Sequence, residues 1–457
     1  MQKSLIVISY VGIAVAFSTG VLQDGPIARA LDLGNPDGIR DQAVPVQEGP
    51  TAGSLGAPVE IPQESLEASP EILGAQDVPT QSETIVNFDK DFLIKERVEP
   101  WKAGFQDRLD VPAKISPLAA KNILNGIVSA GSRLVAVGIR GHIIYSDDKG
   151  KSWTQSKVPL SSDLTAVFFP SPKHGWAVGH DGVVLNSADG GITWTKQLDG
   201  YEACRIMNKY YKTHPVSETS PDPEKIRSDI QYMIKQGPVY PFLDVWFENE
   251  SVGFIVGAFN LIFRTENGGK SWEPWFDRTE NPFSYHLYSI RCNGKDVYIS
   301  GEQGLLMKLD HRAKRLRAQK TPYNGTFFGI VGKPGAVVAY GMGGNIFHSE
   351  NGGVSWKRAG IDGVTISDDR STPAYRRLQE SSVAEVPPTI LGGAVRNDGS
   401  IILVDQGGKA MISKDTGKTF TTLKQEGPPI PMHAVTVADD TTLATAGWFG
   451  IKMLKIR

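Results

Sequence analysis

One eight-residue phrase recurs five times along this chain of 457 residues. The copies are SDDKGKSW from Ser146, SADGGITW from Ser187, TENGGKSW from Thr265, SENGGVSW from Ser349 and SKDTGKTF from Ser413. Each has a hydroxyl residue first, Asp or Asn third, Gly fifth, a second hydroxyl residue seventh and an aromatic residue last. Because internal repeats indicate one structural unit used many times, this phrase constrains the fold more than any other feature.

The chemistry of the phrase predicts a tight β-hairpin turn. The Asp or Asn side chain can accept hydrogen bonds from backbone N–H groups of its own turn, and the Gly two places later can adopt the left-handed conformation. The phrase resembles the Asp-box, or bacterial neuraminidase repeat (BNR), found in the blades of β-propellers. We assign a structural role to Asp148, Trp153, Asp189, Trp194, Asn267, Trp272, Asn351, Trp356, Asp415 and Phe420.

A longer stem precedes each Asp-box and also occurs twice without one. It consists of a short strand that mostly ends in a small residue and Gly, a tight turn, and a second apolar strand. The seven stems span residues 135–146, 176–187, 254–265, 297–309, 337–349, 401–413 and 442–456. We therefore predict an all-β fold, a seven-bladed β-propeller over residues 86–457, with insertions at 199–240 and 360–387.

The last stem leaves room for only three strands before the chain ends. Propellers protect their edges by closing the ring, so we expect the fourth strand of blade seven to come from residues 86–118. That pairing would also give Trp101 a place to pack.

The N-terminal region is predicted to carry a targeting segment and a linker. Lys3 and the mostly apolar run after it make residues 1–30 typical of a secretory signal peptide, with an uncleaved anchor as the alternative. Residues 31–85 are rich in Pro, Gly, Ser, Glu and Gln, which predicts a disordered acidic linker. We expect a periplasmic or otherwise extracytoplasmic protein. The alternative is that its N-terminal segment anchors it to the inner membrane in the same compartment.

Both insertions lie in connections between blades. Such connections share a face with the turns between the second and third strands, so we predict that both insertions border this face, which we call the insertion face. Binding residues concentrate on loops of rigid scaffolds, although ordinary solvated turns are the alternative for each residue. The predicted partner-binding residues are Arg140, His180, Asp181, Phe259, Asn260, Glu302, Gln303, Gln406, Trp448 and Phe449.

The first insertion is predicted to form two helices. One covers about 201–211, and the second begins at Asp222 and runs to about Lys235 with apolar residues at helical spacing. The stripe of Ile226, Ile230, Met233 and Ile234 is expected to pack on the propeller, or alternatively to face a partner. A basic run in blade four, residues 308–320, is expected to be an outer strand and its turn, where an acidic partner or the acidic linker could dock.

The sequence offers little support for catalysis or cofactor binding. Cys204 and Cys292 could form a disulfide or remain separate thiols. No Cys/His cluster indicates a metal and no motif indicates nucleic-acid binding, and each Asp-box loop has too few carboxylates for a calcium site, the alternative we considered. Asp181 and Glu302 are the carboxylates that a glycosidase could use, so a glycan-binding or glycan-cleaving propeller is the alternative function.

Seven blades, an export signal and Asp-boxes after stems of the VG-x-x-G type make the chain similar to the photosystem II stability/assembly factor-like family. The similarity covers residues 119–457 and implies a scaffold without enzymatic activity or cofactor, which binds a membrane protein during assembly. The long linker, the insertions and the lack of an arginine-rich patch favour a non-photosynthetic bacterial member. The implied partner is an integral membrane protein or envelope complex, with a transporter of the resistance-nodulation-division type as one candidate, and the implied state is a monomer.

Overall fold

The computed structural model describes residues 106–218, 220, 222–363 and 387–456. The chain divides into two units, Met1–Thr84 and Ile85–Arg457, and all described residues belong to the second. The predicted signal segment, the acidic linker, Trp101 and most of the second insertion lie outside the described residues.

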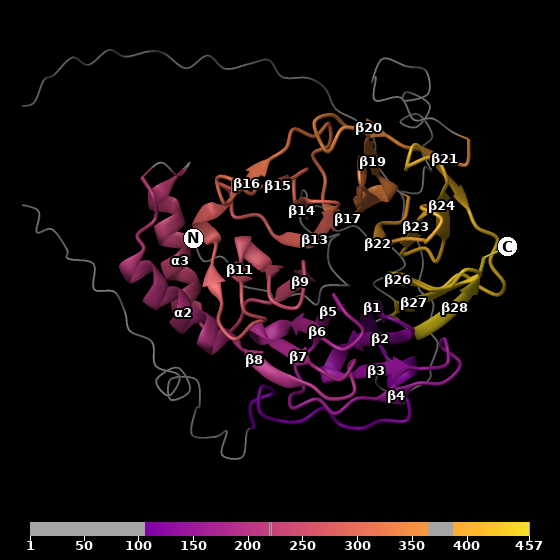
Figure 1. The fold of residues 1–457 in the computed structure, drawn as a ribbon, viewed down its shortest axis with the longest axis horizontal. Helices are drawn as coiled ribbons and strands as arrows, with labels where there is room; N and C mark the ends of the chain where they lie inside the picture. The colour runs from indigo at the N-terminus through magenta and orange to yellow at the C-terminus, as the bar shows by residue number, and fades with distance from the viewer. Residues whose placement is uncertain (1–105, 219, 221, 364–386, 457) are drawn as a thin grey trace, which may run out of the picture. The chain divides into compact units, whose positions relative to one another are not determined.

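Seven antiparallel sheets form the body, and their innermost strands are neighbours all the way round a ring (Figure 1). The predicted seven-bladed β-propeller is therefore confirmed. Blade one consists of β1 (Leu124–Ala130), β2 (Arg133–Gly138), β3 (Ile143–Ser146) and β4 (Thr154–Gln155), and blade two of β5 (Leu164–Phe168), β6 (Gly175–Gly179), β7 (Val184–Ser187) and β8 (Thr195–Leu198). Blade three consists of β9 (Phe242–Phe247), β10 (Gly253–Gly257), β11 (Ile262–Thr265) and β12 (Glu273–Pro274), blade four of β13 (Leu287–Asn293), β14 (Asp296–Gly301), β15 (Leu306–Asp310) and β16 (Arg315–Ala318), and blade five of β17 (Phe327–Lys333), β18 (Ala336–Gly341), β19 (Ile346–Ser349) and β20 (Lys357–Arg358). Blade six consists of β22 (Ile390–Val395), β23 (Ile401–Asp405), β24 (Ala410–Ser413) and β25 (Thr419–Thr422), and blade seven of β26 (Met432–Asp439), β27 (Thr442–Gly447) and β28 (Gly450–Lys455). Blade six carries one more strand, β21 (Gly360–Ile361), which runs parallel to β25.

The glycine that ends most second strands has a steric cause. A Cβ added to Gly138 would lie 2.1 Å from the carbonyl oxygen of Ile123, and one added to Gly341 would lie 2.0 Å from that of Thr326. Both contacts are closer than real Cβ atoms come, so the chain entering the inner strand leaves room only for glycine. In blade six the corresponding residue is Asp405, which is buried and whose pKa is raised by burial.

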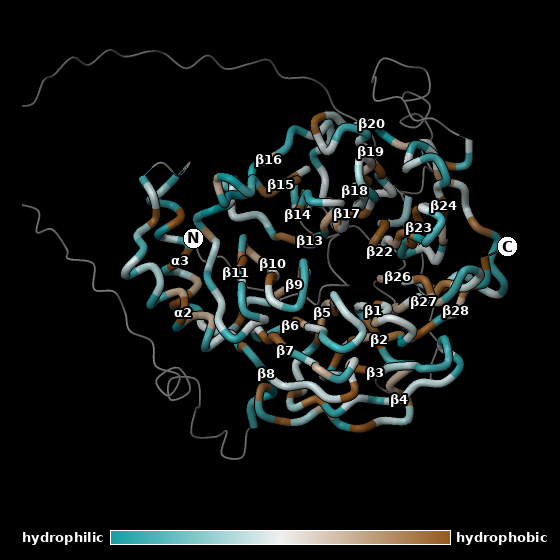
Figure 2. Tube along the Cα trace, in the orientation of Figure 1, coloured by the Kyte–Doolittle hydropathy of each residue, from teal (hydrophilic) through white to brown (hydrophobic). Residues whose placement is uncertain are grey.

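The core lies between the blades, where side chains of facing sheets interdigitate. Trp176 of blade two and Phe247 of blade three stack with ring centroids 3.6 Å apart, and both rings are almost fully buried. In Figure 2 hydrophobic residues follow the strands, while the connecting turns are largely hydrophilic. This is the pattern expected of sheets that are packed on both faces.

The ring closes through the innermost strands of blades seven and one. The Ser129 hydroxyl of β1 lies 3.1 Å from the Thr436 hydroxyl of β26 and donates to the Val437 carbonyl at 3.0 Å. The expected fourth strand of blade seven is wrong for residues 106–118, which form no strand. That segment instead follows the link between blades one and two, where Ala113 N–H donates to the Val158 carbonyl.

The first insertion forms the two predicted helices, α2 (Gly200–Thr213) and α3 (Pro223–Gln236). The Asp199 and Asp222 side chains cap them by accepting from backbone N–H groups of their first turns. The apolar stripe of α3 is buried against blades two and three, which confirms the prediction of core packing. Cys204 of α2 and Cys292 of β13 form no disulfide.

Candidate functional site on the insertion face

The Asp-boxes carry out the predicted structural role. In blade two, the Asp189 carboxylate accepts from Ser187 at 2.8 Å and from the Thr193 hydroxyl at 2.6 Å, while the indole of Trp194 donates to the Gly191 carbonyl. Gly191 has a φ of 89°, in the left-handed region that favours glycine. All five boxes share the hydrogen bond from the first hydroxyl to the Asp or Asn oxygen, at Ser146, Ser187, Thr265, Ser349 and Ser413.

The helices of the first insertion lie on the face that presents the turns between second and third strands. Gly200, the first residue of α2, packs so closely that a Cβ there would approach Pro238 at 2.5 Å and the Asp181 carbonyl oxygen at 2.9 Å. Because Asp181 belongs to such a turn, this contact confirms that the first insertion borders the insertion face. The second insertion lies mostly outside the described residues.

Side chains are presented around this face by a strained backbone conformation. Arg140, Asp181, Phe259 and Gln303 occupy the same position in the turns of blades one to four, and their φ angles are 57°, 58°, 55° and 51°. The left-handed region costs non-glycine residues about 1–2 kcal/mol each. Blade five has Gly343 at this position, with a φ of 64°. These four residues therefore adopt a backbone conformation that glycine would adopt at a lower energetic cost. Strain of this kind is typical of functional sites.

The structure places the ten predicted residues in different environments. Arg140, Phe259, Gln303, Trp448 and Phe449 are exposed, while His180, Asp181, Glu302 and Gln406 are half-buried. Burial lowers the pKa of His180, so its ring favours the neutral form.

Asn260 is corrected from a partner-binding residue to a structural one. Its side chain is only 1% exposed, donates to the Phe276 carbonyl and accepts from Thr279 and Asn281. These bonds tie the turn of blade three to the connection that follows β12. The side chain of Asn260 is thus satisfied within the fold.

The two carboxylates considered for glycan hydrolysis are both engaged in local contacts. Asp181 accepts from Arg108 at 3.1 Å and from the Ser162 hydroxyl at 2.7 Å. Glu302 accepts from the backbone N–H of His286 at 2.9 Å, and its carboxylate lies 3.2 Å from Nδ1 of the same residue. Burial acts most strongly on the pKa of Glu302 and would raise it, but the hydrogen bonds and charge of His286 outweigh burial and lower it. A general acid requires the opposite, a raised pKa.

The main feature missed from the sequence is an aromatic row across blades three to five. Tyr240 meets Phe259 at 5.6 Å between ring centroids, Phe259 meets His286 at 4.4 Å, and His286 meets Tyr288 at 6.0 Å. Tyr288 in turn contacts Phe328 at 4.9 Å. The cluster of aromatic residues in NPFSYHLY, residues 281–288, was the available signal.

The connection between blades three and four lies beside Phe259, the exposed member of this row. Phe283 is 68% exposed and packs on Tyr285, whose backbone carbonyl accepts from the N–H of Asn260. Ser284 of the same loop bonds Lys225 and Asp229 of α3. The insertion, the blade-three turn and this loop thus form one connected surface with Phe259 and Phe283 exposed on it.

A second exposed apolar group lies at the seam of blades seven and one. Trp448 and Phe449 occupy the turn between β27 and β28, and the backbone of Ala120 and Lys121 packs against that turn at Gly450. His433 of β26 lies beneath Trp448, with ring centroids 6.2 Å apart. The seam therefore adds two large aromatic side chains to the insertion face.

Within the described parts of the chain, no cluster of three or more His, Cys, Asp or Glu side chains could hold a metal. None of the described helices combines the length and the apolar character needed to cross a bilayer.

The five Asp-boxes and seven sheets define a seven-bladed Asp-box β-propeller. A family model described as "Photosynthesis system II assembly factor YCF48" matches residues 145–208 and 233–383. This match and the relatives below make the chain similar to the photosystem II stability/assembly factor-like family.

Two curated relatives carry related names. The photosystem II assembly lipoprotein Ycf48 of Synechococcus sp. (strain CC9902) is 29% identical over 144 residues, covering 31% of this chain and 40% of the relative. The chloroplastic photosystem II stability/assembly factor HCF136 of Oryza sativa subsp. japonica is 24% identical over 229 residues, covering 48% of this chain and 51% of the relative. The chain thus spans about half or less of the length of these relatives.

Solved structures share the fold at low identity. Virginiamycin B lyase from Staphylococcus aureus has a TM-score of 0.50 at 11% identity, over 76% of this chain and 98% of the lyase. The structure titled "YCF48 bound to D1 peptide" has a TM-score of 0.49 at 14% identity, over 74% of this chain and 94% of that one. Likeness at this level extends to the fold alone.

Proposed function

We propose that this propeller is an assembly or stability factor that binds an integral membrane protein through its insertion face, outside the cytoplasm. The names of its relatives support an assembly role. The observation that carries the choice of face is the group of large exposed aromatic side chains on it, and its turns also hold four non-glycine residues at positive φ. This strain has a function if those side chains contact a partner.

The aromatic side chains give the face its binding chemistry. Phe259, Phe283, Trp448 and Phe449 are each more than two-fifths exposed. Aromatic residues supply much of the binding energy of protein interfaces, because they bury large areas with little loss of conformational freedom. Large exposed aromatics on one face therefore favour a protein partner.

Site-specific photo-crosslinking in intact cells tests this proposal. Benzoylphenylalanine placed at Phe259 or Phe283 is expected to link the protein to a membrane protein. The matched control is Val354, which is 77% exposed on the Asp-box turn of blade five and is expected to give no such product. Equal crosslinking from Val354 would contradict the choice of face.

The crosslinked product and a separate cell fractionation address the narrower predictions about the partner and the location. Mass spectrometry of the product names the partner and distinguishes an assembly intermediate from a transporter of the resistance-nodulation-division type. Release of the protein by osmotic shock without membrane disruption would indicate a periplasmic location. The monomeric state and the non-photosynthetic bacterial host stay predictions.

A further inference from the structure

Blade four carries an excess of positive charge. Residues 287–320 contain eight Lys and Arg and three Asp and Glu, whereas the whole chain has a formal net charge of −2. The basic residues are Arg291, Lys295, Lys308, Arg312, Lys314, Arg315, Arg317 and Lys320. Blade four is also one of the two blades that lack an Asp-box, so its third and fourth strands are joined differently.

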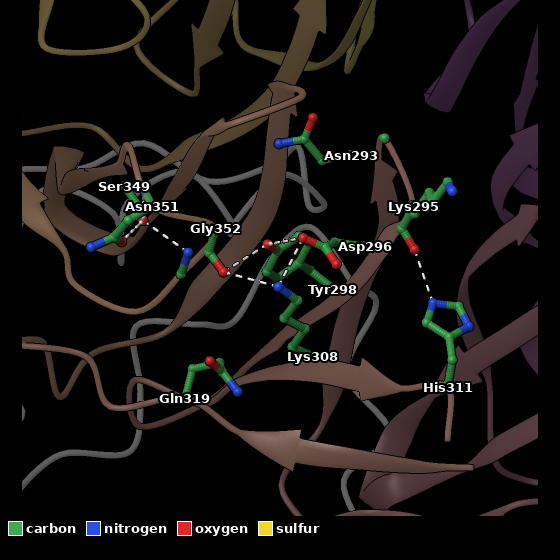
Figure 3. Close-up of polar contacts among 12 residues, drawn as sticks. Asn293, Lys295, Asp296, Tyr298, Lys308, His311, Gln319, Ser349, Asn351 and Gly352 are labelled. Carbon is green, nitrogen blue, oxygen red and sulfur yellow. Dashed lines mark hydrogen bonds and ion pairs between the residues drawn. The ribbon is translucent and has the colours of Figure 1, made fainter. Parts of the chain in front are cut away.

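The turn that replaces the Asp-box gathers several of these cations. It comprises His311–Lys314 between β15 and β16, and the Asp310 carboxylate fixes it by accepting from the Ala313 N–H at 2.9 Å. His311 Nε2 lies 2.9 Å from the Lys295 carbonyl, which belongs to the turn between β13 and β14 (Figure 3). Two turns of one face are thereby joined, and we call Lys295, His311, Arg312 and Lys314 the basic corner.

The acids of blade four do not neutralise this corner. Asp296 pairs with Lys308 at 2.8 Å, as Figure 3 shows, and Asp310 lies 3.7 Å from Arg317. None of the ion pairs among described residues involves Lys295, Arg312 or Lys314, and all three are exposed. Three cations are therefore available for an external ligand.

The backbone of the corner also holds a cation at a strained position. Lys314 has a φ of 49°, in the left-handed region, which glycine adopts at a lower energetic cost than any other residue. The carboxylate of Glu266 on the neighbouring blade is paired with Arg264, whose hydrogen bond and charge lower the pKa of Glu266 most, while the charge of Lys314 adds a smaller lowering. Among the described residues, no carboxylate forms an ion pair with Lys295, Arg312 or Lys314.

We propose that the basic corner binds an acidic, extended segment of a second protein, on the face opposite the insertion helices. This goes beyond the proposed function, because it makes the propeller a two-faced adaptor. A flat anionic membrane is a poorer ligand, since it would also meet the carboxylates that the other turns present on this face, including Asp148, Asp189 and Glu350. An extended segment needs to contact only one blade.

Fluorescence anisotropy with the full chain tests the proposal. The probe is a labelled twelve-residue peptide of alternating Glu and Ser, titrated at about 50 and 300 mM salt. The double variant Arg312→Glu/Lys314→Glu is expected to weaken binding about tenfold or more, as is the higher salt. The control Lys209→Glu/Lys235→Glu makes the same charge change at exposed helix positions and is expected to stay within about twofold of wild type.

A second variant separates binding from folding. Arg312→Gln/Lys314→Gly removes both charges and also relieves the strained φ at residue 314, so a loss of stability cannot explain weaker binding. Equal weakening in the control pair, or no peptide binding by wild type at low salt, would overturn the proposal. So would binding to phosphatidylglycerol vesicles that depends on Arg312 and Lys314 while the peptide does not bind.

Discussion

Phe259 and His286 pack with ring centroids 4.4 Å apart although they belong to blades three and four. Phe259 lies in a turn at positive φ, and His286 precedes the inner strand β13, where it also contacts Glu302. The strained turn of one blade is therefore coupled to the inner strand of the next. This pair joins the exposed aromatic surface to the rigid ring that positions it.

Relief of the turn strain is expected to stabilise the fold. Gln303→Gly should raise the free energy of unfolding by up to about 1 kcal/mol, because glycine adopts the left-handed region without penalty but loses more entropy on folding. The corresponding turn of blade six provides the control, since Gln406 is not among the described residues with positive φ. Gln406→Gly should lower stability by about 0.5–1 kcal/mol. Urea unfolding measures both, and two changes of the same sign would contradict the strain argument.

The Asp-box of blade two is expected to tolerate Asn but not Ala. Asn267 and Asn351 fill the same position in blades three and five and make the equivalent bonds to Ser271 and Ser355. Asp189→Asn should therefore change stability little, whereas Asp189→Ala should cost about 1 kcal/mol or more through unpaired turn groups. Thermal unfolding distinguishes the two.

The same substitution should alter the acid response. Burial acts most strongly on the pKa of Asp189 and would raise it, but its hydrogen bonds with Thr193 and Ser187 lower it overall. The ionised carboxylate therefore contributes stability above its unfolded pKa of 3.8, and this is lost as pH falls through the folded value. Asp189→Asn should flatten stability below about pH 4 relative to wild type.

His433 is expected to make the ring seam sensitive to mild acid. Burial lowers its pKa from 6.5 to about 4. The unfolded chain thus binds the proton first, so the stability contributed by neutral His433 is present above pH 6.5 and lost as pH falls toward 4. The slope is at most about 1.4 kcal/mol per pH unit.

The test is His433→Leu, followed by thermal unfolding between about pH 4 and 7.5. The variant should lose less stability than wild type as pH falls through this range. His348, whose pKa burial also lowers, remains in both proteins and cancels in the comparison. Identical pH slopes in the two proteins would show that His433 does not titrate as proposed.

The anchoring of α2 is expected to depend on its tyrosine hydroxyls. The Tyr210 hydroxyl donates to Glu273 at 2.9 Å and accepts from Arg278 at 2.8 Å. Tyr210→Phe should cost about 1 kcal/mol and speed amide hydrogen exchange in α2. Tyr232→Phe is the control, because Tyr232 is half exposed on α3 and no hydrogen bond to its hydroxyl is found among the described residues. Faster exchange in both variants would argue against a specific anchor.

The sequence predicted the local features of this fold well. The Asp-box at Asp189 and the helix cap at Asp222 are formed by residues within one turn of each other, so their bonds follow from short spacing. The seven stems repeat the same chemistry, and their number set the blade count. Features that depend on residues far apart in the chain were less accessible.

The candidate site shows this limit clearly. Asn260 and Phe259 are adjacent in one turn, yet only the fold reveals that Asn260 is buried and accepts hydrogen bonds from Thr279 and Asn281. Likewise, Arg108 reaches Asp181 across 73 residues of sequence. The path of residues 106–118 along blades one and two, and not to blade seven, also depends on such long-range contacts.

The most direct test of the central claim is a pull-down from crosslinked native membranes, read by quantitative mass spectrometry. Wild type is compared with Phe259→Ser/Phe283→Ser on the insertion face and with Ile192→Ser/Val354→Ser on Asp-box turns, which are also exposed. The account predicts that wild type and the Asp-box variant enrich the same integral membrane protein, and that the insertion-face variant loses it. Equal enrichment by all three, or loss only in the Asp-box variant, would contradict it.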